Sequence, residues 1–338
     1  METLTKHTIQ VFEHQLLRVG EVRDGVVFTR QHFEALAAYA ERNTEKHYTL
    51  HHNGVRFTNY VGALQVGRLT IEILPKIDQA DDVNIQHVLL DMLKACRILQ
   101  PESPGFAKLS LRFGSLLDLY LHQYINEVAQ ILHQGLTKSY TPVAANRQVL
   151  KGRLLLEKQL QYNLAHRERF YTESYEFTYN HEYNILLNNA IKALTQLPVH
   201  PAIQFEAQQL LYRFPALKQV SNPLPNPAEL YFTRQTKRYE SAVRTALLIL
   251  QQFQPDVRAG QLPVLAILFD MNALFEEFIY RQLKNAADKA TIVLRQVRQS
   301  FWERRYLQPD ILLIKKDQRI VLDTKWKRLQ KASPEMND

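Results

Sequence analysis

The sequence predicts an α+β protein with a β-rich N-terminal region, a helical middle region and a C-terminal region of one helix followed by strands. Three changes of pattern along the 338 residues support this prediction. Short apolar runs separated by glycine fill the first hundred residues, apolar residues at helical spacing dominate from residue 115, and strand-like runs return after residue 290. We therefore expect domains at residues 1–104, 105–254 and 255–338.

The composition excludes several classes of protein. With 46% hydrophobic and 22% charged residues, the chain is not disordered throughout. Its longest apolar run, Leu262–Phe269, is too short to cross a bilayer, and no basic-then-apolar leader opens the sequence. A single cysteine, Cys96, excludes an internal disulfide and a cysteine-based zinc site. We expect a cytoplasmic protein without a membrane partner, and the absence of a Walker A motif argues against nucleotide hydrolysis by this chain.

The first region is predicted to hold short strands and then one helix. Strand-like runs cover Glu21–Phe28, Tyr48–Leu50, Arg56–Tyr60, Ala63–Val66 and Leu69–Leu74. We expect Gly62 and Gly67 to interrupt these strands. A helix is predicted over residues 82–100, and the breaking sequence Pro101–Gly105 predicts the first domain boundary.

The middle region is predicted to be helical. Ser115 can cap a helix that ends near Gly135, and further helices are expected over residues 182–197, 206–213 and 241–253. Seven aromatic residues lie close in sequence to arginines: Tyr162, Phe170, Tyr171, Tyr175, Phe177, Tyr179 and Tyr183. Such rings can stack on nucleic-acid bases, but we favour the interpretation that they pack in the core and between helices.

The C-terminal region begins after Pro255. An amphipathic helix is predicted around Met271–Leu283, followed by strands at Thr291–Val297, Pro309–Ile314 and Arg319–Trp326. Residues 291–331 include eleven basic and four acidic residues, so this segment carries +7 of the chain's net charge of +8. Such clustering is typical of a protein that binds a polyanion, with a solvated basic surface as the alternative.

The last two predicted strands bring three ionisable groups together. If their hairpin centres on Lys316 and Asp317, each residue faces the one whose number is 633 minus its own. Asp310 then lies opposite Asp323, with Cβ atoms about 5 Å apart. Because side chains alternate along a strand, Asp323 and Lys325 share one face. The hairpin therefore places two carboxylates and an amine at one end.

These residue types predict metal-assisted hydrolysis of a phosphodiester bond. Two facing carboxylates repel each other unless a cation lies between them. Mg²⁺ favours one or two carboxylates together with water and phosphate oxygens. Lys325 could orient or deprotonate an attacking water while Asp310 and Asp323 hold the metal. A surface hairpin with one ion pair is the alternative interpretation.

A further carboxylate is expected from the preceding helix. At about 100° per residue, Glu276 falls on the border of the buried stripe, close to the direction of Leu283. Glu277 is expected to point toward solvent. We therefore prefer Glu276 as a further metal ligand, with both glutamates as surface charges as the alternative.

Several segments resemble one family. They are Val61–Ile77, Leu150–Leu154, Arg169–Glu173 and Met271–Phe278. On these segments the sequence resembles the McrC family, the nuclease subunit of McrBC-type 5-methylcytosine-dependent restriction systems. Asp310, Asp323 and Lys325 match the PD-(D/E)xK positions of that family, and Glu276 matches its helix glutamate.

The resemblance implies a restriction-endonuclease-like core in the C-terminal region and a role in antiviral defence. It implies a Mg²⁺-dependent endonuclease that cuts double-stranded DNA together with an McrB-like AAA+ GTPase ring. The partner would use the GTP and this chain would stimulate its hydrolysis, with residues 1–104 as the expected contact. We expect Lys315, Lys316, Lys327 and Arg328 to contact DNA phosphates without reading the sequence.

Two alternatives to this function stay open. The family's core continues beyond the strand of Asp323 and Lys325, whereas this sequence ends at Asp338, so we expect the core to be incomplete at its C-terminus. A non-catalytic adaptor that activates the GTPase ring is therefore one alternative. The other is a stand-alone PD-(D/E)xK nuclease of the repair type.

Overall fold

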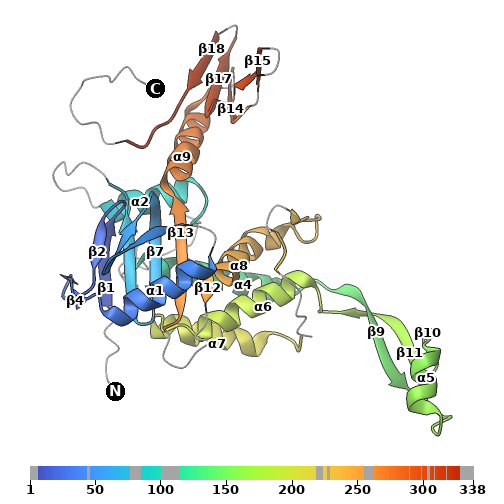
Figure 1. Ribbon diagram of the computed structural model, residues 1–338. Coiled ribbons are helices and arrows are strands. Elements are labelled where there is room, and N and C mark those ends of the chain that lie inside the picture. The colour runs from blue at the N-terminus through green and yellow to red at the C-terminus, as the bar shows by residue number, and fades with distance from the viewer. Residues whose placement is uncertain are drawn as a thin grey trace, which may run out of the picture. The chain divides into compact units, whose positions relative to one another are not determined.

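The computed structural model describes residues 7–43, 46–76, 85–99, 115–217, 224–226, 229–254, 262–288, 290–297, 299–302, 305–307, 309–316 and 318–327. Helices and strands are mixed, which confirms the predicted α+β class (Figure 1). The chain divides into two compact units. Unit 1 comprises Met1–Gln123, Leu197–His200 and Gln252–Asp338, and unit 2 comprises Tyr124–Gln196 and Pro201–Gln251. The division into three consecutive domains stays a prediction.

Unit 1 is built on a five-stranded sheet with the strand order β1-β8-β7-β13-β12. Its strands are β1 (His7–Phe12), β7 (Tyr60–Val66), β8 (Leu69–Leu74), β12 (Phe253–Gln254) and β13 (Val264–Asp270). β1 runs parallel to β8, and the other neighbours are antiparallel. Two strands from beyond residue 252 thus complete a sheet begun in the first 74 residues.

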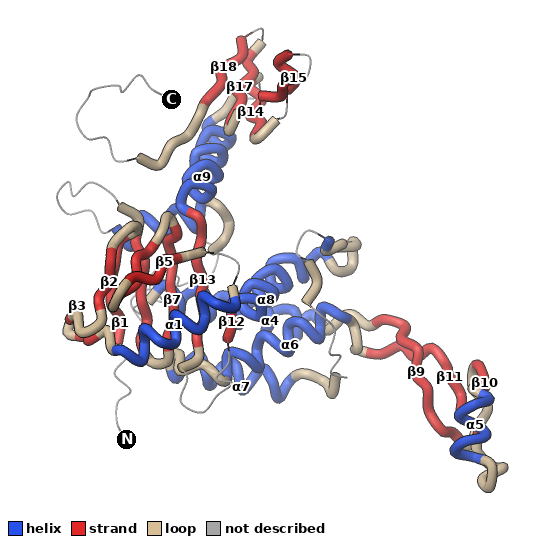
Figure 2. Tube along the Cα trace, viewed as in Figure 1, coloured by secondary structure: helices blue, strands red, loops and turns tan. Residues whose placement is uncertain are grey.

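The middle of this sheet is buried on both faces. Every residue of β8 is buried, and so are five consecutive residues of β13, Val264–Leu268. Because neighbouring residues of a strand point to opposite faces, apolar material must cover both sides. Helix α1 (Arg30–Arg42) contacts β7 and β13 and crosses the sheet in Figure 2, while α2 (Ile85–Ala95) contacts β8.

Gly62 lies inside β7, so the predicted interruption at this residue is wrong. Its φ of +134° is a conformation that side-chain-bearing residues rarely adopt. A Cβ atom at this position would clash with the Ile267 carbonyl oxygen and lie 3.2 Å from the Leu268 Cα on β13. The glycine therefore allows the two backbones to approach closely, and the strand continues through it. Gly67 does separate β7 from β8, as predicted.

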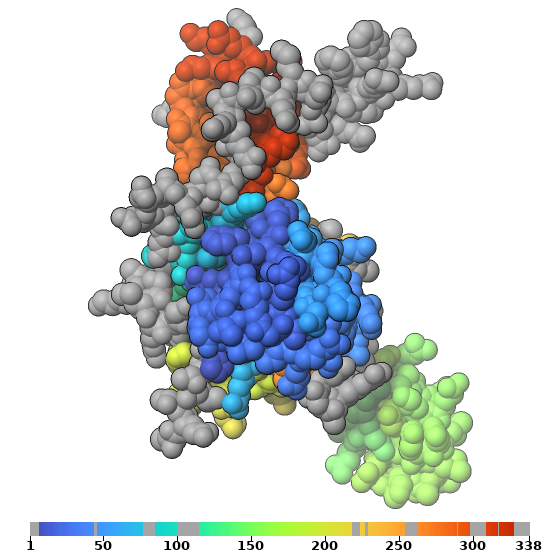
Figure 3. Space-filling model, turned by 60° about the vertical axis from the view of Figure 1, so that its left-hand side comes forward, coloured from blue at the N-terminus to red at the C-terminus, as the bar shows by residue number. Residues whose placement is uncertain are grey.

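A second, smaller sheet and a short hairpin complete the N-terminal part of unit 1. The sheet has the order β2-β6-β5, from β2 (Leu16–Arg18), β5 (Tyr48–His51) and β6 (Gly54–Phe57). The hairpin joins β3 (Val22–Arg23) to β4 (Val26–Val27). These elements and α1 form one continuous face of the unit, drawn in blue in Figure 3.

Unit 2 contains the predicted helices. Helix α4 (Leu116–Gln134) contributes residues to both units, and its N-terminus is capped by Ser115, whose Oγ accepts the Asp118 N–H at 3.2 Å. The other helices are α6 (Glu182–Thr195), α7 (Pro201–Arg213), the 3₁₀ turn η2 (Lys237–Tyr239) and α8 (Glu240–Gln252). These positions confirm the predicted helices at 115–135, 182–197, 206–213 and 241–253.

An antiparallel β-ribbon that the sequence did not predict projects from these helices (Figure 1). Its strands are β9 (Ser139–Arg147), β10 (Arg153–Leu154) and β11 (Phe170–Thr178), and helix α5 (Leu156–Asn163) packs on β11. We call residues 139–178 the arm. The prediction of a helical middle region is wrong here, because β9 carries mostly small and polar residues instead of an apolar strand pattern.

The C-terminal part of unit 1 begins with helix α9 (Met271–Ala286), which confirms the predicted helix. A three-stranded sheet follows in the order β14-β17-β18, from β14 (Thr291–Arg295), β17 (Ile311–Lys315) and β18 (Gln318–Leu322). Strands β15 (Gln299–Trp302) and β16 (Arg305–Leu307) form a separate pair. The last predicted strand, Arg319–Trp326, is wrong at its end, since β18 stops at Leu322 and Asp323 follows it.

None of the helices in the described part of the chain is both long enough and apolar enough to cross a membrane.

Candidate functional site

Helix α9 starts where the central sheet ends. Asp270, the last residue of β13, accepts the Ala273 N–H on Oδ1 at 2.9 Å and so caps the helix. Its Oδ2 accepts the Asn59 side-chain N–H at 2.6 Å, and the Met271 N–H donates to the Asn59 carbonyl at 2.8 Å. One carboxylate thus ties the first turn of α9 to the start of β7, which fixes the direction in which the helix leaves the sheet.

The register of the β17–β18 hairpin is the predicted one. Ile311 pairs with Leu322 and Lys315 pairs with Gln318, so paired residue numbers add up to 633. The two-residue connection includes Lys316, whose φ of 53° is left-handed as tight hairpin turns require. Asp310 and Asp323 are therefore the next facing positions after the last paired residues.

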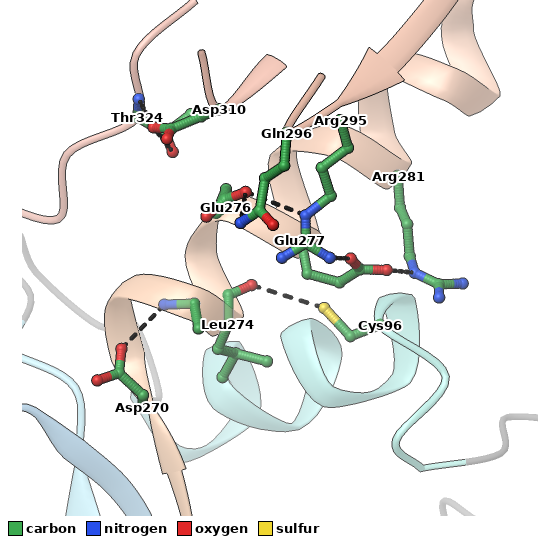
Figure 4. Close-up of polar contacts among 11 residues, drawn as sticks. Cys96, Asp270, Leu274, Glu276, Glu277, Arg281, Arg295, Gln296, Asp310 and Thr324 are labelled. Atoms are coloured by element: carbon green, nitrogen blue, oxygen red, sulfur yellow. Dashed lines mark hydrogen bonds and ion pairs between the residues drawn. The ribbon is translucent and has the colours of Figure 1, made fainter. Parts of the chain in front are cut away.

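Asp310 binds the segment that follows β18. Its Oδ2 accepts the Thr324 N–H at 2.7 Å and the Thr324 hydroxyl at 3.0 Å (Figure 4). Its backbone carbonyl accepts the Gln296 N–H at 3.0 Å. Asp310 thus joins three chain segments, and its carboxylate is directed at Thr324.

Asp323 and Lys325 share one face of this segment, as their spacing predicted, and the structure shows that this face is exposed. Their side chains are 66% and 51% exposed, and Lys325 Nζ lies 3.6 Å from Asp323 Oδ2. Exposure alternates along the segment, because Thr324 and Trp326 are partly buried between exposed neighbours. The segment therefore presents one carboxylate and one ammonium group together to solvent.

Glu276 is held by two partners from the start of the C-terminal sheet. Its Oε1 accepts Arg295 Nε–H at 3.0 Å and the Gln296 side-chain N–H at 2.9 Å (Figure 4). Glu277 also pairs with Arg295, and in addition with Arg281. The glutamate side chains are only 13% and 19% exposed, so the expectation that Glu277 points to solvent is wrong. A helix wheel could not show that β14 packs beside α9 and presents a guanidinium to both glutamates.

The arrangement fits part of the predicted metal site. Carboxylate oxygens at facing strand positions are the ligands that Mg²⁺ prefers, so the donor types of Asp310 and Asp323 are suitable. Glu276 is engaged with Arg295 and Gln296 instead. Among the residues that the structure describes, no three His, Cys, Asp or Glu side chains lie together as metal ligands would. The structure therefore does not bring Asp310, Asp323 and Glu276 into one cluster.

The predicted phosphate contacts have different surroundings. Lys315 Nζ pairs with Asp288 Oδ2 at 2.9 Å, and hydrogen bonds from Thr291 and Lys315 lower the pKa of that aspartate. Lys316 and Lys327 are exposed, and Arg328 lies outside the described residues. Lys316 and Lys327 thus lie at the surface, and Lys315 is paired with a carboxylate.

Sequence reasoning missed the residues that hold the segment after β18. Trp326 Nε1–H donates to Glu13 Oε1 at 2.6 Å, and the tryptophan ring lies 5.1 Å from the Phe275 ring, centroid to centroid. Glu13 and Trp326 are 313 positions apart, which no local pattern reveals. The alternation of Asp323, Thr324, Lys325 and Trp326 was the available signal, since it marks Thr324 and Trp326 as the inward-facing pair.

The arm carries a second notable surface. The prediction that the seven aromatic residues between positions 162 and 183 pack in the core and between helices is wrong for four of them. Tyr162, Tyr175, Phe177 and Tyr179 are exposed, whereas Tyr183 on α6 is buried. The arm and its helix also expose Tyr140, Val149, Leu150, Leu156, Leu160 and Leu164. An exposed apolar surface of this kind marks an interaction site in many proteins.

The fold and the site define a mixed α+β protein whose C-terminal hairpin ends in two aspartates and a lysine. The chain belongs to the McrBC family, since the family described as McrBC 5-methylcytosine restriction system component matches residues 55–337. No curated protein matches the sequence.

Two similar solved structures come from Thermococcus gammatolerans. One is described as a refined half-complex from a tetradecameric assembly of McrB AAA+ hexamers with bound McrC. It has a TM-score of 0.64 and 17% identity, with 97% of this chain and 82% of that chain covered. The other is a cryo-EM structure of the McrBC complex, with a TM-score of 0.59, 18% identity and coverage of 83% and 88%. At these identities the likeness concerns the fold.

Proposed function

We propose that this chain is the DNA-cleaving subunit of an McrBC-type restriction system, a Mg²⁺-dependent endonuclease with a PD-(D/E)xK core. The observation that carries the proposal is the register of β17 and β18, which makes Asp310 and Asp323 facing positions. Lys325 lies beside Asp323 on the same side of the segment. Family membership supports this chemistry over an accidental surface ion pair.

Each residue has a distinct role in the proposed reaction. Asp310 and Asp323 would hold Mg²⁺, which supplies charge stabilisation at the phosphate and a more acidic water when bound. Lys325 would orient the attacking water and stabilise negative charge on the phosphate. Glu276 would act on the metal only after leaving Arg295 and Gln296, or through water. Lys315, Lys316, Lys327 and Arg328 would contact the phosphates of double-stranded DNA.

The proposed partner is an McrB-like AAA+ GTPase ring, which would use the GTP. The two similar structures are described as complexes of McrB with McrC, which supports such a partner for a protein of the same fold. The exposed apolar residues of the arm favour the arm as a contact surface. Tyr140 of β9 pairs with Phe177 of β11 across the ribbon, and Tyr175 lies two residues before Phe177 on the same strand. Tyr140 and Tyr175 are both 71% exposed. The N-terminal residues 1–104 stay a second predicted contact.

The test is cleavage of cytosine-methylated plasmid DNA by the full chain with its AAA+ partner, GTP and MgCl₂. We expect D323A and K325A to lower the cleavage rate about 100- to 1,000-fold or more, because D323A removes a metal ligand and K325A removes the group that orients the water and stabilises charge on the phosphate. GTP turnover by the partner and formation of the complex should not change. D91A, which removes an exposed carboxylate on α2, is the matched control. A D323A or K325A variant that cuts like the unchanged chain would show that the site is elsewhere.

One observation favours a second function, that of a non-catalytic adaptor which activates the GTPase ring. The Glu276 carboxylate is occupied by Arg295 and Gln296, and the described residues hold no three-ligand cluster. Stimulated GTP turnover without any DNA cleavage would support the adaptor. Cleavage that needs neither partner nor GTP would instead indicate a stand-alone nuclease of the repair type.

A further inference from the structure

The segment of Asp323 and Lys325 lies outside regular structure. β18 ends at Leu322, and residues 323–327 belong to neither a helix nor a strand. Sheet hydrogen bonds therefore do not fix these residues. Two inward-facing side chains set the position of Asp323 and Lys325. Thr324 lies between these two residues, and Trp326 follows Lys325.

Thr324 provides a local anchor. Its N–H and its hydroxyl both donate to Asp310 Oδ2, at 2.7 and 3.0 Å. Both bonds stay within the hairpin, so they hold Asp323 beside Asp310. A single anchored residue still leaves the chain beyond it free to turn about the backbone bonds that follow, and Lys325 lies beyond it.

Trp326 provides a distant anchor. Its indole N–H donates to Glu13 Oε1 at 2.6 Å, a charge-assisted bond. Its ring packs on Phe275 of α9 with centroids 5.1 Å apart and the planes tilted by 57°. With Thr324 on one side and Trp326 on the other, Lys325 is held between two fixed neighbours.

Glu13 is itself rigidly held. It is 3% exposed and directly follows β1. Its N–H donates to the Leu74 carbonyl at 3.0 Å, and its Oε1 accepts the Lys76 N–H at 2.8 Å. A carboxylate buried at the edge of the central sheet costs free energy unless donors surround it, and Trp326 is one of these donors. Glu13 Oε1 thus accepts both the Lys76 N–H and the Trp326 indole N–H, so loss of the indole removes one of these donors from a buried carboxylate.

We propose that Trp326 is a positioning residue, which uses Glu13 and Phe275 to fix Lys325 and Asp323 relative to the central sheet. This inference rests on the proposed nuclease function. Trp326 would act on the reaction only indirectly, through the positions of Lys325 and Asp323. The central sheet of unit 1, rather than the exposed strand β18, thus sets the geometry of the site.

The first experiment separates positioning from binding. W326F keeps an aromatic ring that can contact Phe275, and it removes the N–H that Glu13 accepts together with part of the ring area. Misplacement of a reacting group by about 1 Å can cost about 100-fold in rate, so we expect kcat for plasmid cleavage to fall about 10- to 100-fold. KM for DNA and GTP turnover by the partner should stay within about twofold, because W326F itself changes no side chain that is proposed to contact DNA phosphates or the partner.

Variants of Glu13 supply a graded comparison. E13Q keeps an oxygen that can accept the indole N–H, so most of the activity should return relative to E13A. E34A and E34Q are matched controls, since Glu34 lies on α1 with its side chain 63% exposed and pairs only with its helix neighbour Arg30 among the contacts described here. Equal loss in E13Q and E13A, with W326F unaffected, would overturn the role of the hydrogen bond.

A second measurement does not depend on cleavage. Hydrogen exchange of the Thr324 amide, followed by mass spectrometry in the full chain, reports how firmly residues 323–327 are held. We expect W326F to speed this exchange about five- to tenfold, the effect of losing one buried hydrogen bond, while the amides of β8 keep their protection.

The two measurements distinguish the possible failures. If the unchanged chain does not cleave DNA, the proposed nuclease function is wrong. Faster exchange in W326F would then show that Trp326 is a purely structural anchor, which overturns the proposal. Unchanged exchange and unchanged kcat in W326F would overturn the positioning role while the nuclease function stands.

Discussion

The two sheets of unit 1 are held in different ways. In the central sheet, β7, β8 and β13 are buried almost throughout. In the C-terminal sheet, β17 begins with the buried pair Ile311 and Leu312, but four of the five residues of β18 are exposed. Polar contacts of Arg295 and Asp310 join segments within the C-terminal part, and the indole of Trp326 bonds it to Glu13 beside the central sheet. The central sheet thus depends on apolar burial, and the proposed site on a few directional bonds.

This difference matches the demands on each region. Burial is non-directional and gives stability in proportion to the apolar area removed from water. Hydrogen bonds and ion pairs contribute less on balance, but they specify the orientation of side chains. The region that positions Asp323 and Lys325 needs bonds that fix the orientation of side chains. The central sheet stabilises this region through the bond between Trp326 and Glu13.

The largest effect is expected from filling Gly62. G62A places a Cβ against the Ile267 carbonyl oxygen at a φ of +134°, so β7 and β13 must separate. We expect the free energy of unfolding to fall by more than about 4 kcal/mol, measured by urea denaturation. G25A is the control, because Gly25 also has a positive φ of 74° but has no atom within 4 Å of its Cβ position. It should lose about 1 kcal/mol.

A smaller effect is expected from truncating one isoleucine in each sheet. I71A in β8 removes a fully buried side chain and should cost about 2–5 kcal/mol of unfolding free energy. I320A in β18 removes one that is 51% exposed and should cost about 0.5 kcal/mol or less. Comparable losses in the two variants, measured in the same denaturant series, would contradict the contrast between the sheets.

The smallest effect is expected from Arg295. R295M keeps much of the side-chain stem but leaves Glu276 and Glu277 without their shared partner, so we expect a loss of about 1–2 kcal/mol that shrinks at high salt. R30M is the control, since its ion pair with Glu34 is exposed and should contribute about 0.5 kcal/mol or less. If R295M is as stable as the unchanged chain, the polar contacts of α9 with β14 do not hold the C-terminal sheet.

Local rules explain what could be predicted. The helix cap at Ser115 and the predicted helix ranges depend on residues a few positions apart. The hairpin register depends on a two-residue turn, so Asp310 and Asp323 could be placed at facing positions before any coordinates were known. The expectation for Glu277 failed because Arg295 reaches it from β14, and the expectation for the aromatic residues failed because the arm exposes them instead of burying them.

The sequence by itself determined the family, most of the helices though not α1 and α5, the register of β17 and β18, and the common face of Asp323 and Lys325, because periodicity and turn length act within a few residues. Only the tertiary structure decided that β13 pairs with β7, that Arg295 engages Glu276, and that Trp326 reaches Glu13. These contacts join residues up to 313 positions apart, and their partners are selected by packing in three dimensions rather than by any pattern along the chain.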